Sequence, residues 1–299
     1  MADFDITEIA NAKTEAEADA AIKKFNEKLQ QKESEKKKKK IPLVKTMDLS
    51  GRLALLDELR GLCLLAMMAY HLFYIMGFMF GMERGAALHG AMRPFAPIPA
   101  AFFVIIAGFC VCYSKDLSRR GLKLLIYALC ISLGTIVILP MFGIDDMAVW
   151  FGILHLLAVA KLLMALWQKF FGKVPWFIGL PLSLLLFQYT SSVSARYFSL
   201  FGHFTLTLPD FLYNTNWLLP LGFHTPGFTT WDYFPLLPFL FLFMFGVFLG
   251  RPMKDSLPKF CYRSTFLPLA WLGRHSLGIY LAHMFILYGV VHFFYTVFS

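Results

Sequence analysis

Arg60 and His71 lie eleven residues apart in the first strongly apolar stretch of the chain. On a helix that turns about 100° per residue, eleven steps return to within roughly 20° of the starting direction and rise about 16 Å. The two side chains are therefore expected to share one face. Asp57 lies one turn before Arg60 on the same stripe, so an ion pair between them is predicted to hold the arginine at the start of the helix.

His71 would then lie about halfway into a bilayer whose hydrocarbon core is roughly 30 Å thick. An ionisable side chain at that depth is costly and usually faces a polar cavity or a partner on another helix. An imidazole there could act as a general base. A neutral histidine that only hydrogen-bonds a neighbouring helix is the alternative, and the presence of Arg60 and Asp57 on the same face favours a functional role.

Two further histidines fall at membrane depth. His155 ends the segment FGILH, and His283 shares a helical stripe with Ser276 and Tyr280. For His283 a packing hydrogen bond is the preferred interpretation, with a supporting role in the site as the alternative, and His155 is comparable.

A basic loop, SKDLSRRGLK, runs from Ser114 to Lys123 beside the start of an apolar stretch. Its cations include Arg119, Arg120 and Lys123, which suit a polyphosphate ligand that approaches from the cytosol. Taken in isolation, the loop is better explained by the tendency of cytosolic loops to be basic, and that interpretation is preferred.

The elements that must position these residues are transmembrane helices. Of the 299 residues, 58% are hydrophobic and 16% are charged, which is the composition of an integral membrane protein and predicts an all-α, polytopic helix bundle. Seven apolar stretches are predicted to span the membrane, at about 61–80, 95–113, 123–142, 147–167, 174–190, 233–250 and 274–297. The net charge of +9 lies largely in Lys36 to Lys40 and in short loops, where it indicates topology and lipid contact rather than nucleic acid binding.

Basic residues gather in alternate loops, which predicts a cytosolic N-terminus, no cleaved signal peptide and a C-terminus outside. Residues 1–48 are expected to form a polar, basic tail, and residues 49–299 a membrane domain. Within that domain, an aromatic outer loop spans about 191–232. Its aromatic side chains could stack on sugar rings or rest at the membrane interface, and the second interpretation is preferred.

Several classes of protein lose support. The five cysteines show no metal-ligand spacing, so they are interpreted as free thiols and no metal site is predicted. No glycine-rich phosphate loop, G-x-S-x-G or H-E-x-x-H motif occurs in the sequence. The lack of an internal repeat weakens a transporter interpretation, although a proton-coupled transporter of small solutes remains the alternative.

The order of several short motifs resembles the heparan-alpha-glucosaminide N-acetyltransferase catalytic-domain family, over about Arg52 to Val291. These motifs are LDELRG followed by MMAYH, then FFVIIAGF, FGILH, WDYFPLLPF and WLGRHSLGIYLAH. The spacing of Arg60 and His71 and the AGF segment are also similar to the membrane O-acyltransferases of bacterial surface glycans, a related family. FGILH and DYFPLLP favour the first family.

The resemblance implies an acyltransferase that takes an acetyl group from cytosolic acetyl-CoA, its phosphates near Arg119, Arg120 and Lys123, with Arg60 as a further candidate. The pantetheine arm would reach toward the middle of the membrane, where the thioester would meet His71. His71 would be the general base, with an acetyl-histidine intermediate as the alternative. Asp232 and Tyr233, at the outer end of the sixth stretch, would support the acceptor; Asp232 could equally cap that helix. The acceptor would be a glycan or amino sugar, the location the bacterial plasma membrane, and a homodimer is compatible with the sequence.

Overall fold

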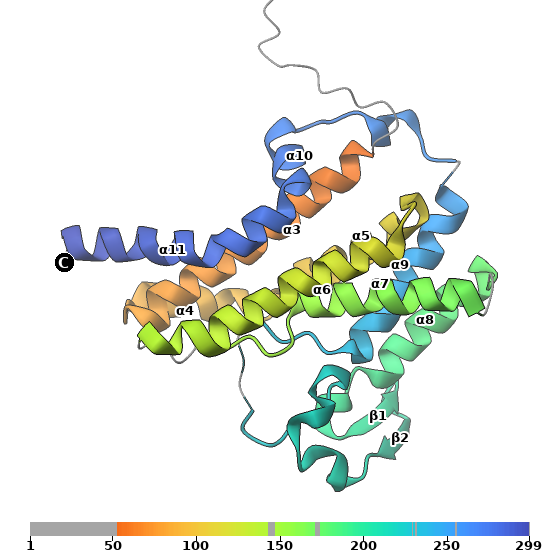
Figure 1. Cartoon of the computed structure of the whole chain (residues 1–299), viewed down its shortest axis with the longest axis horizontal. Coiled ribbons are helices and arrows are strands. Elements are labelled where there is room, and N and C mark those ends of the chain that lie inside the picture. Colours follow the sequence, from red (N-terminus) through yellow and green to blue (C-terminus); the bar gives the residue numbers. More distant parts are fainter. Residues whose placement is uncertain are drawn as a thin grey trace, which may run out of the picture. The chain divides into compact units, whose positions relative to one another are not determined.

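The computed structural model describes residues 53–142, 147–170, 174–228, 230, 232–254 and 256–298. This part of the chain is nearly all-α, as predicted (Figure 1). The expected N-terminal tail, residues 1–48, lies outside the described residues. Elements carry the labels of Figure 1.

Within the described residues, six helices are long and apolar enough to cross a membrane, so the chain is an integral, multi-pass membrane protein. They are α3 (Ala54–Tyr74, extended by η1, Ile75–Met79), α6 (Leu117–Leu133, extended by η3, Gly134–Ile138), α7 (Ile153–Phe170), α8 (Trp176–Thr190, with a span that continues to Ala195), α9 (Leu236–Met253) and α11 (Ser276–Phe298). A seventh span is formed if α4 (Glu83–Met92) and α5 (Pro97–Phe109, followed by η2, Cys110–Tyr113) count as one, bent by 54°. This agrees with the predicted number of about seven.

Helix α3 begins at Ala54, several residues before the predicted start at 61. The difference arises because its charged residues find partners inside the protein. Glu58 accepts hydrogen bonds at Oε1 from the hydroxyl of Ser264 at 2.7 Å and from the backbone N–H groups of Thr265 and Phe266 at 2.6 and 2.8 Å. A carboxylate satisfied in this way can lie within a helix that is otherwise apolar.

Close backbone contacts join the helices in pairs. Gly108 of α5 faces the carbonyl oxygen of Phe243 in α9, and Gly246 of α9 faces the carbonyl oxygen of Ile105, so closely that a Cβ at either glycine would collide with that oxygen. The short helix α10 (Leu267–Arg274) packs along α3 in the same manner, with Gly61 and Gly273 at the contact. Small residues at these points let neighbouring helices approach closely. Inside a membrane, where no water is expelled, this close van der Waals packing holds the helices together.

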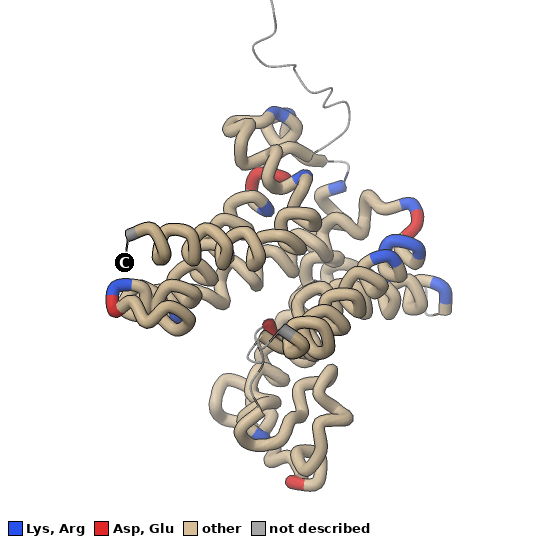
Figure 2. Tube along the Cα trace, turned by 60° about the vertical axis from the view of Figure 1, so that its left-hand side comes forward, with Lys and Arg blue, Asp and Glu red and all other residues tan. Residues whose placement is uncertain are grey.

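Most charged residues of the described part lie near the ends of the helices, with long uncharged stretches between them (Figure 2). Tyr113 donates a hydrogen bond to the carbonyl oxygen of Lys254 at 3.4 Å. Together with the bonds from 264–266 to Glu58, this places the loops after α5 and after α9 at the same end of the bundle as the start of α3. The basic loops identified in the sequence therefore lie together.

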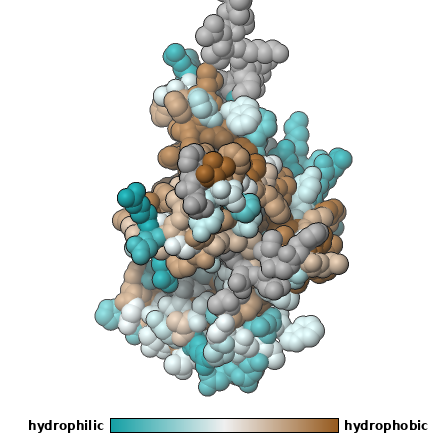
Figure 3. All heavy atoms as spheres, turned by 90° about the vertical axis from the view of Figure 1, so that its left-hand side faces the viewer, coloured by the Kyte–Doolittle hydropathy of each residue, from teal (hydrophilic) through white to brown (hydrophobic). Residues whose placement is uncertain are grey.

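The predicted outer loop, 191–232, is the main exception to the helical fold. Two short strands, β1 (Tyr197–Leu200) and β2 (Phe204–Thr207), pair antiparallel, and the 3-10 turns η5 (Val193–Ala195), η6 (Asp210–Tyr213) and η7 (Asn216–Leu221) complete the segment. Val193, Tyr213 and Phe223 form a small core of their own. In Figure 3 this lower part of the surface is mostly hydrophilic or neutral, whereas apolar side chains cover much of the helices above it.

Candidate active-site cavity

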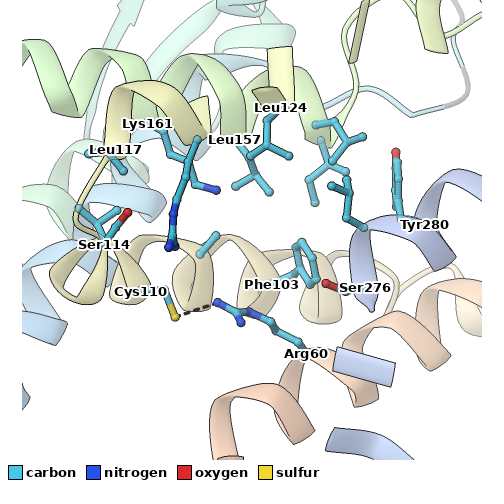
Figure 4. A pocket seen from close by; sticks show the side chains of 16 residues that line it. Arg60, Phe103, Cys110, Ser114, Leu117, Leu124, Leu157, Lys161, Ser276 and Tyr280 are labelled. Atoms are coloured by element: carbon cyan, nitrogen blue, oxygen red, sulfur yellow. Dashed lines mark hydrogen bonds between the residues drawn. The ribbon is translucent and has the colours of Figure 1, made fainter. Parts of the chain in front are cut away.

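A cavity of about 200 Å³ lies between the helices that carry the residues singled out in the sequence (Figure 4). Its walls come from α3, α5, α6, α7 and α11. Much of the lining is apolar, including Phe103, Leu124 and Leu157. Its polar lining residues are Arg60, Cys110, Ser114, Arg120, Lys161, Ser276 and Tyr280.

Arg60 reaches this cavity from α3 and is held from two sides. Its Nη1 lies 3.2 Å from Oδ1 of Asp57, which confirms the predicted ion pair. Its Nη2 donates a hydrogen bond of 2.8 Å to the sulfur of Cys110 at the end of α5. Asp57 is only 2% exposed, and its other oxygen lies 3.4 Å from Nε of Arg274 in α10. One buried carboxylate is thus shared by two arginines.

Two more cations reach the same cavity, Arg120 at the start of α6 and Lys161 in the middle of α7. No acidic side chain is among the described residues that line it. Lys161 was not singled out in the sequence, although a lone lysine within the apolar run AVAKLLMALW is itself a signal that it lies at a functional position.

A second, more polar cavity of about 430 Å³ adjoins the first and shares Val111, Ser114 and Leu117 with it. Arg119 and Lys115 line it, together with Asp116. Arg119 and Arg120, neighbours in the sequence, therefore face different cavities. Lys123, the third predicted phosphate ligand, lines neither of them.

His71 and His283 lie beside each other, with ring centroids 5.3 Å apart. Neither lines the first cavity, but His283 follows one turn after Tyr280, which does, and those two rings are 5.4 Å apart. Nδ1 of His283 lies 2.6 Å from the carbonyl oxygen of Tyr280. A carbonyl only accepts, so Nδ1 carries the proton and Nε2 keeps its lone pair. That buried Nε2 has no hydrogen-bond partner among the described residues.

His155 belongs to a different environment. Its Nδ1 accepts a hydrogen bond of 3.2 Å from the backbone N–H of Gly152, so Nε2 carries the proton and donates to the hydroxyl of Ser132 at 3.2 Å. That hydroxyl donates in turn to the carbonyl oxygen of Val149 at 2.7 Å. Both ring nitrogens are therefore engaged in holding the start of α7, and the packing interpretation considered for this histidine describes its contacts.

Asp232 joins two helices at the end of the bundle that carries β1 and β2. Its Oδ2 accepts hydrogen bonds from the backbone N–H of Ile153, at 3.1 Å, and from the hydroxyl of Tyr280. It therefore caps α7, not α9 as considered from the sequence, because the chain before α9 folds back against Phe151. Burial raises the pKa of this carboxyl, while its two hydrogen-bond donors oppose the rise.

Gly152 makes this arrangement possible, because a Cβ there would collide with the carboxylate of Asp232. Tyr233, the neighbour of Asp232, donates a hydrogen bond of 2.8 Å to the carbonyl oxygen of Leu219 and packs against His224 and Phe228. Burial raises the pKa of its hydroxyl. Tyr233 thus ties the 191–228 segment to the start of α9 and does not reach the cavity.

Comparison with known families adds the last observation. Residues 52–285 match the family model described as heparan-alpha-glucosaminide N-acetyltransferase, catalytic. The chain belongs to this family. Neither a curated protein nor a solved structure matches the chain.

Membership of the heparan-alpha-glucosaminide N-acetyltransferase family makes the protein a membrane acetyltransferase. The matched range includes the first cavity and the His71–His283 pair, and it leaves out only the last part of α11 among the helices described above. No group of three or more metal-ligating side chains occurs within the described parts of the chain.

Proposed function

We propose that the protein moves an acetyl group from acetyl-CoA, bound at the end of the bundle with the basic loops, to an amine or hydroxyl of a sugar that approaches from the opposite side. The observation that carries this proposal is one continuous arrangement. The second, polar cavity (the outer cavity) adjoins the first, largely apolar cavity (the inner cavity). The inner cavity is lined by three cations and by Tyr280, whose ring lies beside that of His283, the neighbour of His71.

The residues fit the donor in kind. Guanidinium and ammonium groups bind phosphates, and an apolar passage suits a pantetheine arm. Arg119 in the outer cavity and Arg120 in the inner cavity retain the role expected of them, and Ser276 lines the inner cavity at the start of α11. Lys123 lines neither cavity, and Lys161, which lines the inner one, takes its place in this proposal.

The chemical step assigned to the histidine pair is a direct transfer. His71, with His283 beside it, takes the proton from the acceptor N–H or O–H, and the acceptor atom forms a bond to the acetyl carbonyl carbon. The C–S bond of the thioester breaks, and the sulfur leaves and takes up a proton as free CoA. The unshared Nε2 of His283 supplies a second site for the proton next to His71.

Orientation follows from the charge of the loops. The loops after α5 and α9 carry Lys115, Lys254 and Arg263, Arg119 lies in the first turn of α6 beside them, and these loops lie at one end of the bundle. Basic loops face the cytosol. The donor end, with the N-terminus, would therefore be cytosolic, and the 191–232 segment would face outward from a bacterial plasma membrane.

The test replaces the two histidines separately. We expect His71→Gln and His283→Gln to bind acetyl-CoA as the wild type does and to lose acetyl transfer to amino sugars by at least about a hundredfold, the scale of general-base catalysis. His203→Gln, an exposed histidine in the β1–β2 turn, is the matched control. Full activity of both His71→Gln and His283→Gln would overturn the assignment of proton transfer to this histidine pair.

A proton-coupled transporter is the second candidate, because two adjacent buried histidines could also relay protons. The two functions separate in proteoliposomes. Solute uptake driven by a pH gradient, without consumption of acetyl-CoA, would favour transport. Release of CoA that depends on an added amino sugar would favour the transferase.

A further inference from the structure

We infer that Arg60, Arg120 and Lys161 form a phosphate subsite that grips the phosphopantetheine end of the donor, and that the distance from Arg60 to His71 places the thioester at the two histidines. This inference rests on the proposed acyl transfer and goes beyond it. It makes the phosphopantetheine thioester, rather than the whole of CoA, the unit that the inner site recognises.

The inner cavity holds more positive than negative charge. The cations come from three different helices, α3, α6 and α7, and they meet around one largely apolar cavity. Asp57 compensates Arg60 but is shared with Arg274. Neither the guanidinium of Arg120 nor the ammonium of Lys161 has an ion-pair or hydrogen-bond partner among the described residues. Arg120 is exposed, whereas Lys161 is partly buried within the apolar helix α7. An unpaired charge on Lys161 is therefore the more costly of the two, and an anionic ligand would relieve that cost.

The charged side chains are distributed unevenly along the inner cavity. In Figure 4 the side chains of Lys161 and Arg60 enter from opposite walls, whereas Tyr280 and Ser276 lie farther along the cavity, with Phe103 nearby. The cavity is therefore cationic toward one end and apolar to weakly polar toward the other. A molecule with a phosphate head and an uncharged arm matches that gradient, whereas a compact anion would fill only the cationic part.

The length of the phosphopantetheine arm matches the distance between Arg60 and His71 along α3. The eleven residues from Arg60 to His71 rise about 16 Å along α3. The arm from the phosphate of phosphopantetheine to its sulfur holds about a dozen bonds, which in extended form span roughly 16 Å. With its phosphate at the three cations, the arm runs past Tyr280 and brings the thioester to the level of His71 and His283. The spacing recognised in the sequence thus acts as a ruler for the donor.

A consequence for donor choice follows. The adenosine part of CoA would lie in the outer cavity, where Asp116 offsets one of the two charges of Lys115 and Arg119 and one positive charge remains. This single positive charge is less than that of the inner cavity, which three cations line. Thioesters of phosphopantetheine should therefore bind nearly as well as those of CoA, while a thioester of pantetheine, which lacks phosphate, should not.

The first test compares four donors with the purified wild-type protein in detergent without phospholipid: acetyl-CoA, acetyl-dephospho-CoA, acetyl-4′-phosphopantetheine and acetyl-pantetheine. Binding is measured by calorimetry in the absence of acceptor. We expect the first three to have dissociation constants within about tenfold of one another and acetyl-pantetheine to bind at least about a hundredfold more weakly. Loss of binding for acetyl-4′-phosphopantetheine equal to that for acetyl-pantetheine would overturn the inference.

The second test uses Lys161→Gln, with Lys161→Arg as the rescue variant and Lys123→Gln as the control, since Lys123 lies outside both cavities. Lys161→Gln should bind acetyl-4′-phosphopantetheine about tenfold or more weakly and leave the weak binding of acetyl-pantetheine unchanged. Lys161→Arg should restore most of the affinity. Equal affinity in Lys161→Gln and the wild type would remove Lys161 from the subsite.

The outcomes separate this inference from the proposed function. Acetyl transfer from acetyl-CoA that is insensitive to Lys161→Gln would sustain the transferase and overturn the subsite. Phosphate-dependent binding without acetyl transfer to any amine or hydroxyl would sustain the subsite and contradict the transferase. Repeating the titration in vesicles identifies lipid phosphate as the occupant if acetyl-4′-phosphopantetheine no longer binds there, which would also overturn the inference.

Discussion

At the scale of single residues, Asp57 supplies the negative charge that compensates two arginines inside the bundle. It is buried, and each of its oxygens faces a different arginine, Arg60 at 3.2 Å and Arg274 at 3.4 Å. Removing one partner of a buried ion pair leaves an uncompensated charge, which costs far more than the pair contributes. The exposed pair of Arg196 and Asp210, at 3.1 Å, has similar geometry without the burial.

Replacement of Asp57 by Asn is therefore expected to destabilise the protein by about 3–5 kcal/mol, because two arginines lose their common counter-charge. Asp210→Asn should cost about 0–1 kcal/mol, since that pair is exposed to solvent. Thermal unfolding in one detergent measures both. Comparable losses of Tm in the two variants would contradict the role given to burial.

Asp232 offers a test by pH. A carboxyl whose pKa is raised on folding binds its proton more tightly in the folded protein than in the unfolded chain. Stability therefore falls as the pH rises from 3.8, the ordinary pKa, toward the raised value, and is constant above it.

Since Asp232→Asn removes this titration, the Tm of the wild type minus that of Asp232→Asn should decrease as the pH rises through this window. Unfolding scans from acidic to neutral pH measure the difference, with Asp210→Asn as the exposed control. A difference that grows with pH would mean that folding stabilises the ionised carboxylate.

At the scale of elements, glycines set the distance between paired helices. Gly246 of α9 lies against the backbone of Ile105 in α5, and a Cβ there has no room. Gly289 of α11 has nothing within 4 Å of the same position, so it provides a matched comparison within an equally apolar helix. The contact of α5 with α9 matters for the site, because α5 carries Phe103 and leads into Cys110 at the cavity.

Gly246→Ala should destabilise the protein by about 1–3 kcal/mol or more, because the two helices must separate or bend. Gly289→Ala should be neutral or stabilising by up to about 1 kcal/mol, since alanine is the better helix former. Unfolding measurements on the purified variants compare them. Equal stability of Gly246→Ala and the wild type would show that α5 and α9 do not pack this closely.

At the scale of the whole molecule, the arrangement of seven spans predicts which loops share a side. With α4 and α5 as one bent span, the loops after α5 and α9 lie on the side of the start of α3, and the β1–β2 segment lies on the other. This separation is what lets a donor and an acceptor reach the histidine pair from opposite sides.

In a variant whose only cysteine is His203→Cys, we expect an impermeant maleimide to react from outside intact cells. In a variant whose only cysteine is Ser256→Cys, we expect the reaction only after the membrane is opened. The five native cysteines must first be replaced, because all of those described are free thiols. Only α9 separates the two positions along the chain, so labelling of both from the same side would contradict the crossing of the membrane by α9. With the start of α3 in the cytosol, the reverse labelling pattern would contradict seven spans and would leave the α4–α5 pair as a re-entrant segment.

Local periodicity and composition were sufficient to predict the membrane-spanning helical class, the approximate number of spans and the pair of Asp57 and Arg60. These features depend on helix geometry and on transfer of apolar side chains into lipid, both of which are properties of short segments. The family was likewise recognisable from the order of short motifs, and its match to residues 52–285 confirms it.

Tertiary structure alone decided which distant residues meet. Lys161 and Cys110 join Arg60 around one cavity, His283 comes beside His71, and the carboxylate of Asp232 caps a helix that begins far from it in the chain. No helical period relates these positions, because their separations are set by how helices pack and by where small residues allow close approach. The sequence by itself determined that a charged face and a buried imidazole share α3, and only the packing of α3, α6, α7 and α11 determined what stands opposite them.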